Sequence, residues 1–177
     1  MVAKEHGRSL IFIFIPLMLV ALIFQIIHLS DFMMENRPSL LVLVLIFFSI
    51  QDKFRFDIEA AFIVGLLLDL LSGAPLGINA LICASHVYII SSQFKRFKQY
   101  VFWQQAIIIA LINLLINFIA YWLEHIIGQS YYEVNFILPS LFTAILWPAV
   151  SFLCQLLAKT FSISLNEEKQ NLWTSLS

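Results

Sequence analysis

The stretch GLLLDLLSGAPLGINAL spans residues 65–81 and places one aspartate, Asp69, inside an otherwise apolar run. The Gly-Ala-Pro-Leu-Gly sequence that follows it predicts a tight turn, because glycine and proline favour turn conformations. Two apolar segments joined by so short a connection are expected to lie antiparallel as a hairpin. What a carboxylate does at this position depends on whether the surrounding medium is water or lipid.

The composition indicates that the medium is a lipid bilayer. Apolar residues make up 61% of the 177-residue chain and charged residues 12%, whereas soluble domains average about 45–50% and about 25%. A soluble fold of this size could not bury so much apolar surface. The net charge of −1 gives no indication of a nucleic-acid partner, and the lipid bilayer is the predicted environment.

Six segments are apolar enough to be membrane spans, since a spanning helix needs about 20 mostly apolar residues. They are residues 10–28, 37–51, 56–72, 76–92, 101–123 and 135–158. The fold class we predict is therefore all-α, a polytopic membrane protein with about six transmembrane helices. Residues 1–160 form this domain, and residues 161–177 form a polar cytoplasmic tail. The second segment is short, and it could be re-entrant instead of crossing the bilayer.

The distribution of basic residues favours crossing. If all six segments cross and the N-terminus is cytoplasmic, nine of the ten Lys and Arg residues lie on the cytoplasmic side and only Arg37 lies outside. Lys and Arg are enriched in short cytoplasmic loops. If the second segment did not cross, Lys53 and Arg55 would join Arg37 outside. We therefore predict a multi-pass protein with both termini in the cytoplasm.

Small residues mark the faces of the third and fourth segments that pack together. The third segment carries a stripe with a spacing of four residues, and the fourth carries small residues at a matching spacing. Small side chains allow membrane helices to approach closely, so we expect close packing between the two. The members are Ala61, Gly65, Asp69 and Gly73 on the third segment, and Gly77, Ala80 and Ala84 on the fourth.

Three roles for Asp69 remain open from the sequence. The carboxylate could lock the hairpin by accepting hydrogen bonds from Asn79, Ser72 and the backbone amides between Gly73 and Gly77. It could pair with a group on a partner protein, or it could carry a proton or cation. Transport would need further ionisable groups within the membrane, and His86 is the only candidate. The candidate hairpin-lock or partner-interface residues are Gly65, Asp69, Ser72, Gly73, Pro75, Gly77 and Asn79.

The fifth and sixth segments each have a polar face. Asn113 and Asn117 lie on one face of the fifth, and Trp147 and Ser151 lie on one face of the sixth. The simplest interpretation is hydrogen bonding between helices, which contributes about 0.6 kcal/mol on average in membranes. The alternative is a ligand pocket or a partner groove. The basic and aromatic loop at residues 91–105 is typical of a topology signal, and it could instead dock a cytoplasmic partner.

The sequence contains no pattern that indicates catalysis. It has no His-Glu-x-x-His sequence, no Walker loop and no Ser, His and Asp grouping of the kind that builds a hydrolase site. The four histidines and two cysteines have no metal-ligand spacing. We therefore predict no catalytic residue, no metal site and no cofactor.

Several motifs together resemble those of the rod shape-determining protein MreD family. GLLLDLLSGAPLGINAL is similar to the signature of that family. NRPSLLVLVLIF at residues 36–47, WQQA at 103–106 and LPSLFTAILWP at 138–148 follow the family pattern in the same order along nearly the whole chain. Asp57 and Glu59 depart from it, because they stand where the family has small or polar residues.

This resemblance implies a non-enzymatic scaffold subunit of the bacterial inner membrane, within the cell-elongation complex that directs peptidoglycan synthesis and rod shape. It implies direct binding to MreC, with MreB, RodA and a class B transpeptidase in the wider complex. The family also resembles the substrate-binding subunits of energy-coupling-factor transporters in fold. The alternative function is therefore a small-molecule-binding membrane subunit of a vitamin-type transporter.

Overall fold

The computed structural model describes residues 3–27, 36–51, 57–73, 75–94, 96–127 and 137–160, and this part of the chain is all-α, as predicted. Each of the six predicted segments overlaps one helix, and α1 begins seven residues before the predicted first segment. The helices are α1 (Ala3–Ile26), α3 (Leu40–Gln51), α4 (Ile58–Ser72), α5 (Ile78–Gln93), α6 (Phe102–Ile127) and α7 (Ile137–Thr160), with a short 3-10 turn η1 (Phe97–Gln99) before α6.

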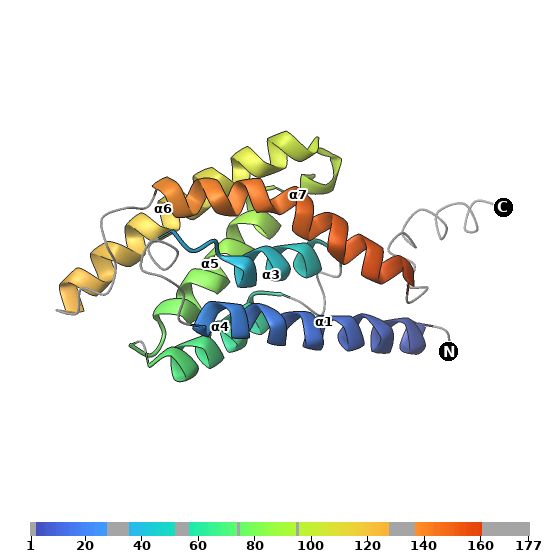
Figure 1. Cartoon of the computed structure of the whole chain (residues 1–177), viewed down its shortest axis with the longest axis horizontal. Helices are drawn as coiled ribbons and strands as arrows, with labels where there is room; N and C mark the ends of the chain where they lie inside the picture. The colour runs from blue at the N-terminus through green and yellow to red at the C-terminus, as the bar shows by residue number, and fades with distance from the viewer. Residues whose placement is uncertain are drawn as a thin grey trace.

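Successive helices run in alternate directions along the long axis of the molecule (Figure 1). One end holds the end of α1, the start of α3 and the turn between α4 and α5, and we call it the hairpin end. The opposite end holds the start of α1, the start of α6 with η1 before it, and the end of α7, and we call it the loop end. Alternation of this kind brings consecutive helices together as antiparallel neighbours.

Helix α3 is the centre of the bundle. Its residues from Leu41 to Ser49 are all buried, and α1, α5 and α7 pack around it. A helix that is apolar on every side is stable only inside such a shell or in lipid. With 12 residues at about 1.5 Å each, α3 is about 18 Å long, short of the roughly 30 Å hydrocarbon core. Its neighbours surround it along that length.

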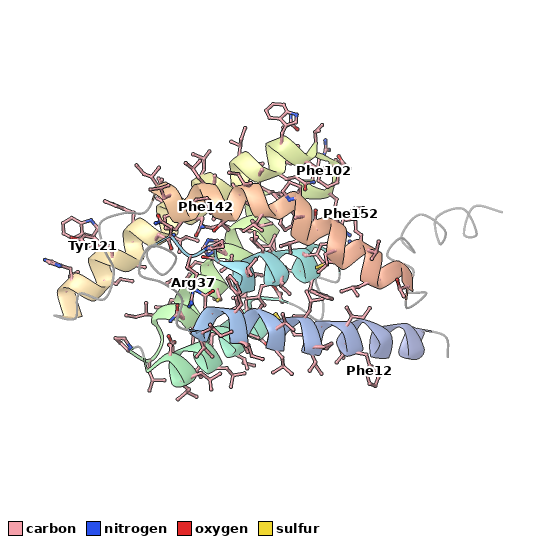
Figure 2. The ribbon with its side chains drawn as sticks, in the orientation of Figure 1. Phe12, Arg37, Phe102, Tyr121, Phe142 and Phe152 are labelled. Atoms are coloured by element: carbon pink, nitrogen blue, oxygen red, sulfur yellow. The ribbon has the colours of Figure 1, made fainter. Side chains whose placement is uncertain are left out.

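Hydrogen bonds to α7 and to the end of α1 hold the chain that leads into α3. The Ser39 amide donates to the Thr143 hydroxyl of α7 at 3.1 Å, and that hydroxyl donates to the Pro139 carbonyl at 2.7 Å. The Arg37 guanidinium donates to the Gln25 and Ile27 carbonyls. A cation is favourable at a helix C-terminus, where carbonyls lack intrahelical partners. Figure 2 shows Arg37 next to the end of α1, at the hairpin end.

The outer faces of the bundle are apolar. Phe12 on α1 and Phe152 on α7 are among the exposed aromatic side chains labelled in Figure 2. Among the residues that the structure describes, two helical stretches of 22 residues, Phe102–Leu123 and Ile137–Ala158, are long and apolar enough to cross a membrane, and Ile11–Ile26 and Leu40–Gln51 are shorter apolar stretches. Pro148 lies within α7, which changes direction partway along its length in Figure 1, because proline removes a helix hydrogen bond.

Gly65 allows α4 and α5 to approach backbone to backbone. A Cβ atom at Gly65 would lie 2.5 Å from the Ala80 Cα and 2.5 Å from the Asn79 carbonyl oxygen. No side chain fits at this position unless the helices separate. The predicted packing role of Gly73 was wrong, since Gly73 ends α4 at φ +69° and a Cβ there would have no atom within 4 Å. Gly73 serves the turn through its left-handed backbone conformation.

Asparagine substitutions at these two glycines should differ in their effect on stability. Gly65→Asn should destabilise the protein, and Gly73→Asn should leave its stability nearly unchanged. We expect Gly65→Asn to destabilise the protein by about 1–3 kcal/mol or more, because the new side chain overpacks a backbone contact. Gly73→Asn is the matched control, since asparagine tolerates the left-handed region and would face open space. Thermal unfolding in detergent measures both. An unfolding temperature for Gly65→Asn equal to that of the unsubstituted chain would contradict the observed contact.

Candidate functional site

Asp69 lies near the end of α4 and accepts hydrogen bonds from the start of α5. Its Oδ2 atom accepts from the Gly77 amide at 2.8 Å and the Ala80 amide at 3.3 Å. Its Oδ1 atom accepts from the Asn79 amide at 3.0 Å and the Asn79 side-chain nitrogen at 2.9 Å. The side chain is 1% exposed. We call Asp69, Gly77, Asn79 and Ala80 the hairpin lock.

The hairpin lock solves two problems of burial together. The first amides of a helix have no intrahelical acceptor, and the N-cap residue of α5, Gly77, has no side chain to provide one. A buried carboxylate, in turn, is tolerated only when its oxygens are hydrogen-bonded. Asp69 acts as a cap for α5 from the neighbouring helix, and its negative charge also lies at the positive end of the α5 dipole.

The carboxylate has little capacity left for another partner. Two carboxylate oxygens offer about four lone-pair sites in total, and four N–H donors already occupy them. Every donor belongs to α5 or to the residue that caps it. This geometry favours the hairpin-lock interpretation of Asp69 over pairing with a partner or carrying an ion.

The other candidate residues of the turn lie outside this cluster. The Ser72 hydroxyl donates to the Leu68 carbonyl at 2.7 Å, so the predicted bond from Ser72 to the Asp69 carboxylate was wrong. A serine hydroxyl near the end of a helix commonly bonds back to its own helix. Pro75 supplies the carbonyl that accepts from the Ile78 amide at 3.4 Å. The Asp69 carboxylate therefore bonds to Gly77 and Asn79 but not to Ser72, Gly73 or Pro75, and Gly65 lies against Asn79 and Ala80.

The polar face of α6 lies inside the bundle. The Asn117 side-chain nitrogen donates to the Asn113 side-chain oxygen at 3.1 Å, and both residues are buried. Asn113 also lies against His86 of α5. The His86 Nδ1 atom is 2.8 Å from the Ile82 carbonyl oxygen, which assigns the proton to Nδ1 and leaves Nε2 as an acceptor. These residues join α5 to α6 by polar contacts.

A second buried cluster lies towards the loop end and centres on Gln105, which the sequence analysis did not single out. Its side-chain nitrogen donates to the Phe97 carbonyl at 3.0 Å and the Tyr100 carbonyl at 2.9 Å. Its side-chain oxygen accepts from the Trp147 indole at 2.8 Å. We call these residues the Gln105 cluster. It ties η1 and the start of α6 to the middle of α7.

Trp147 and Ser151 were both predicted to lie on an inner face, and both are buried. Trp147 contacts the Phe97 ring edge to face, with 5.8 Å between the ring centroids, and bonds to Gln105 as described above. The Ser151 hydroxyl donates to the Pro148 carbonyl at 3.0 Å and so stays within α7. The signal that could have located the Gln105 cluster is the indole of Trp147, because a buried indole N–H usually has an acceptor.

No group of three or more potential metal-binding side chains gathers among the residues that the structure describes.

Asp57 and Glu59, which depart from the family pattern, both lie at the start of α4. The Asp57 side chain caps the helix through the Ile58 amide at 2.8 Å, and Glu59 lies in the first turn. Acidic residues are stabilising there because the N-terminus of a helix carries partial positive charge.

The comparisons with known proteins agree with the sequence resemblance. The family model of the rod shape-determining protein MreD matches residues 7–157. The chain belongs to the MreD family. The rod shape-determining protein MreD of Haemophilus influenzae is 27% identical to it over 117 residues, which cover 66% of this chain and 72% of that protein. No solved structure matches the chain, so the predicted similarity to energy-coupling-factor transporter subunits stays a prediction.

Removing the second carboxylate oxygen of Asp69 should destabilise this MreD-family protein. In Asp69→Asn the amide nitrogen replaces one oxygen and faces N–H donors, so we expect a loss of about 1–3 kcal/mol from unsatisfied buried groups. Asp69→Leu should cost more, because all four donors lose their acceptor. Thermal unfolding in detergent measures both losses.

Glu59→Gln is the control for these variants, since Glu59 is an exposed carboxylate on the same helix. It should destabilise the protein by no more than about 0.3–1 kcal/mol, the contribution of an exposed acidic residue in the first turn of a helix. Asp69→Leu with the stability of the unsubstituted chain would show that the four bonds do not hold the hairpin.

Proposed function

We propose that this chain is a non-enzymatic scaffold subunit of the inner-membrane complex that sets rod shape, and that it binds MreC directly. MreB, RodA and a class B transpeptidase belong to the wider complex in this proposal. Membership in the MreD family supports the role in cell shape. The observation that carries the scaffold role is the hairpin lock, in which the buried carboxylate of Asp69 accepts four hydrogen bonds from N–H groups of its own chain.

Some other buried polar groups follow the same pattern, although the Asn113 Nδ2 and His86 Nε2 atoms are buried without a hydrogen-bond partner. Gln105 uses both ends of its amide to join η1 and α7, and the Asn113 and Asn117 side chains bond to each other. Side chains that act on a substrate need donors, acceptors or lone pairs available to it. Polar groups committed to internal bonds favour a protein that holds its shape and presents a surface.

The hairpin end is the surface we assign to MreC. The hairpin lock fixes the turn, and beside it Leu70, Leu71 and Leu76 are all more than half exposed. A rigid apolar surface binds a partner with less loss of conformational entropy than a flexible one does. A single-span partner with a domain outside the membrane could contact this end of the bundle.

Co-purification tests the proposal and its surface. We expect MreC to co-purify with the unsubstituted chain from native membranes, and Leu76→Arg to reduce the amount of MreC several-fold at unchanged thermal stability. Ile126→Arg is the matched control, because Ile126 is also more than half exposed near the same end but belongs to α6. Undiminished MreC with Leu76→Arg would contradict the hairpin surface. Absence of MreC and retention of a vitamin-sized molecule would favour the transporter alternative.

The orientation is also testable. The alternating helix directions in Figure 1 support six spans with both termini on the same side of the membrane. The distribution of Lys and Arg makes that side the cytoplasm, which would put the loop end inside the cell and the hairpin end outside. The predicted loop around Lys53 lies outside the described residues. The cysteines used for labelling are therefore placed at described residues. In a variant without Cys83 and Cys154, both buried, we expect a membrane-impermeant thiol reagent to label Leu76→Cys in intact cells but not Gln99→Cys. Labelling of Gln99→Cys would overturn this orientation.

A further inference from the structure

An open cavity of about 700 Å³ lies towards the loop end, between the end of α3, residues 97–102 and α7. Ligand pockets in proteins usually measure about 300–1,000 Å³. The buried part of its wall is aromatic, with Phe47, Phe97 and Trp147, and its more exposed part carries Lys98 and Gln99. The cavity therefore has an apolar inner region and a polar opening.

The Gln105 cluster fixes the relative positions of two walls of this cavity. Two of its hydrogen bonds fix the carbonyls of Phe97 and Tyr100, and the third fixes Trp147. All four residues line the cavity. The wall formed by the irregular connection is thus fastened to the wall formed by α7, and a ligand would meet a pocket that is already shaped.

The charges around the cavity favour an anion. Among the described residues that line it, Lys98 is cationic and none is acidic. Val101 and Phe102, at the start of the 26-residue helix α6, also line it, and the N-terminal end of a helix carries partial positive charge. Gln51 and Gln155 add amide groups that can donate hydrogen bonds.

The surroundings indicate that the anion carries an apolar chain. Tyr100, Phe102 and Trp103 are exposed around the start of α6, and Tyr and Trp favour the level of lipid headgroups. A small polar anion would leave the aromatic inner wall without a contact. A ligand with a phosphate at one end and a hydrocarbon chain at the other would satisfy both parts of the wall.

We propose that this cavity binds an anionic phospholipid, with its phosphate group near Lys98 and the start of its acyl chain against Phe47 and Trp147. The assignment of the lipid to the cytoplasmic leaflet rests on the orientation proposed above. The binding itself does not require MreC, so it can fail while the proposed scaffold function stands.

Two charge variants separate a built site from general attraction. Lys98 lines the cavity, whereas Arg96 is exposed two residues earlier and does not. Lys98→Gln and Arg96→Gln each remove one positive charge from the same connection, and so weaken non-specific attraction to an anionic membrane equally. The chain is purified in detergent with phosphatidylglycerol or, as the neutral control, phosphatidylcholine, and bound lipid is counted by native mass spectrometry.

We expect the unsubstituted chain and Arg96→Gln to retain phosphatidylglycerol, and Lys98→Gln to lose it several-fold. Equal losses in the two variants, or equal retention of phosphatidylcholine, would overturn the proposal. Gln155→Trp fills the cavity without changing its charge, and at unchanged thermal stability it should also lose the lipid. Retention by Gln155→Trp would place the lipid elsewhere on the protein.

A competition experiment distinguishes the lipid from a free anion. Excess inorganic phosphate should leave phosphatidylglycerol bound, because phosphate cannot replace the contacts of the acyl chain with the aromatic wall. Displacement by phosphate would show that the pocket recognises the phosphate group alone and would overturn its assignment to a lipid.

Discussion

The carboxylate of Asp69 and its four N–H donors form the constraint on which the α4–α5 hairpin depends. A carboxylate within an apolar bundle is strongly unfavourable unless its oxygens are hydrogen-bonded. The first backbone amides of α5 lack acceptors within the helix, and the N-cap residue Gly77 has no side chain to provide one. Gly65 completes the arrangement by letting the two backbones meet. Asp69 provides the acceptors that the start of α5 lacks, and Gly65 allows the close approach that these hydrogen bonds require. Replacing Asp69 or Gly65 would therefore disrupt these hydrogen bonds.

The position of α5 in turn determines how the centre of the bundle is covered. Helix α3 is apolar throughout and is too short to reach across the hydrocarbon core on its own. It is enclosed by α1, α5 and α7, and the hairpin lock fixes α5 on α4. The chain leading into α3 is held by Thr143 from α7 and anchored to the end of α1 by Arg37. The short helix is thus held by neighbours on several sides.

Local sequence pattern predicted the parts of this structure that depend on local geometry. The apolar runs located the six helices that the structure describes, and the short turn predicted that Asn79 lies opposite Asp69. The same reasoning failed where the backbone conformation decides the outcome. Ser72 bonds to its own helix, and Gly73 serves the left-handed end of α4 and not the packing between helices.

The Gln105 cluster could not be predicted in the same way. Its bonds go to two carbonyls of an irregular connection and to an indole 42 residues further along the chain. No periodicity encodes such contacts, since they depend on how α6 and α7 pack. The sequence WQQA resembles a family motif, but only the structure shows what its second glutamine, Gln105, bonds to. The neighbouring Gln104 uses its oxygen locally, as the acceptor for the Val101 amide at 3.3 Å, which is the bond expected at the third position of a helix.

The N-termini of α5 and α6 lie at different ends of the bundle and have different electrostatic surroundings. At the hairpin end the start of α5 is buried against a carboxylate from its own chain, so its partial charge is already neutralised. Towards the loop end the start of α6 opens on a cavity that carries Lys98 and no acidic side chain among its described lining residues. The N-terminus of a helix favours an anion. The closed end is thereby suited to a rigid protein contact, and the open end to an anionic ligand.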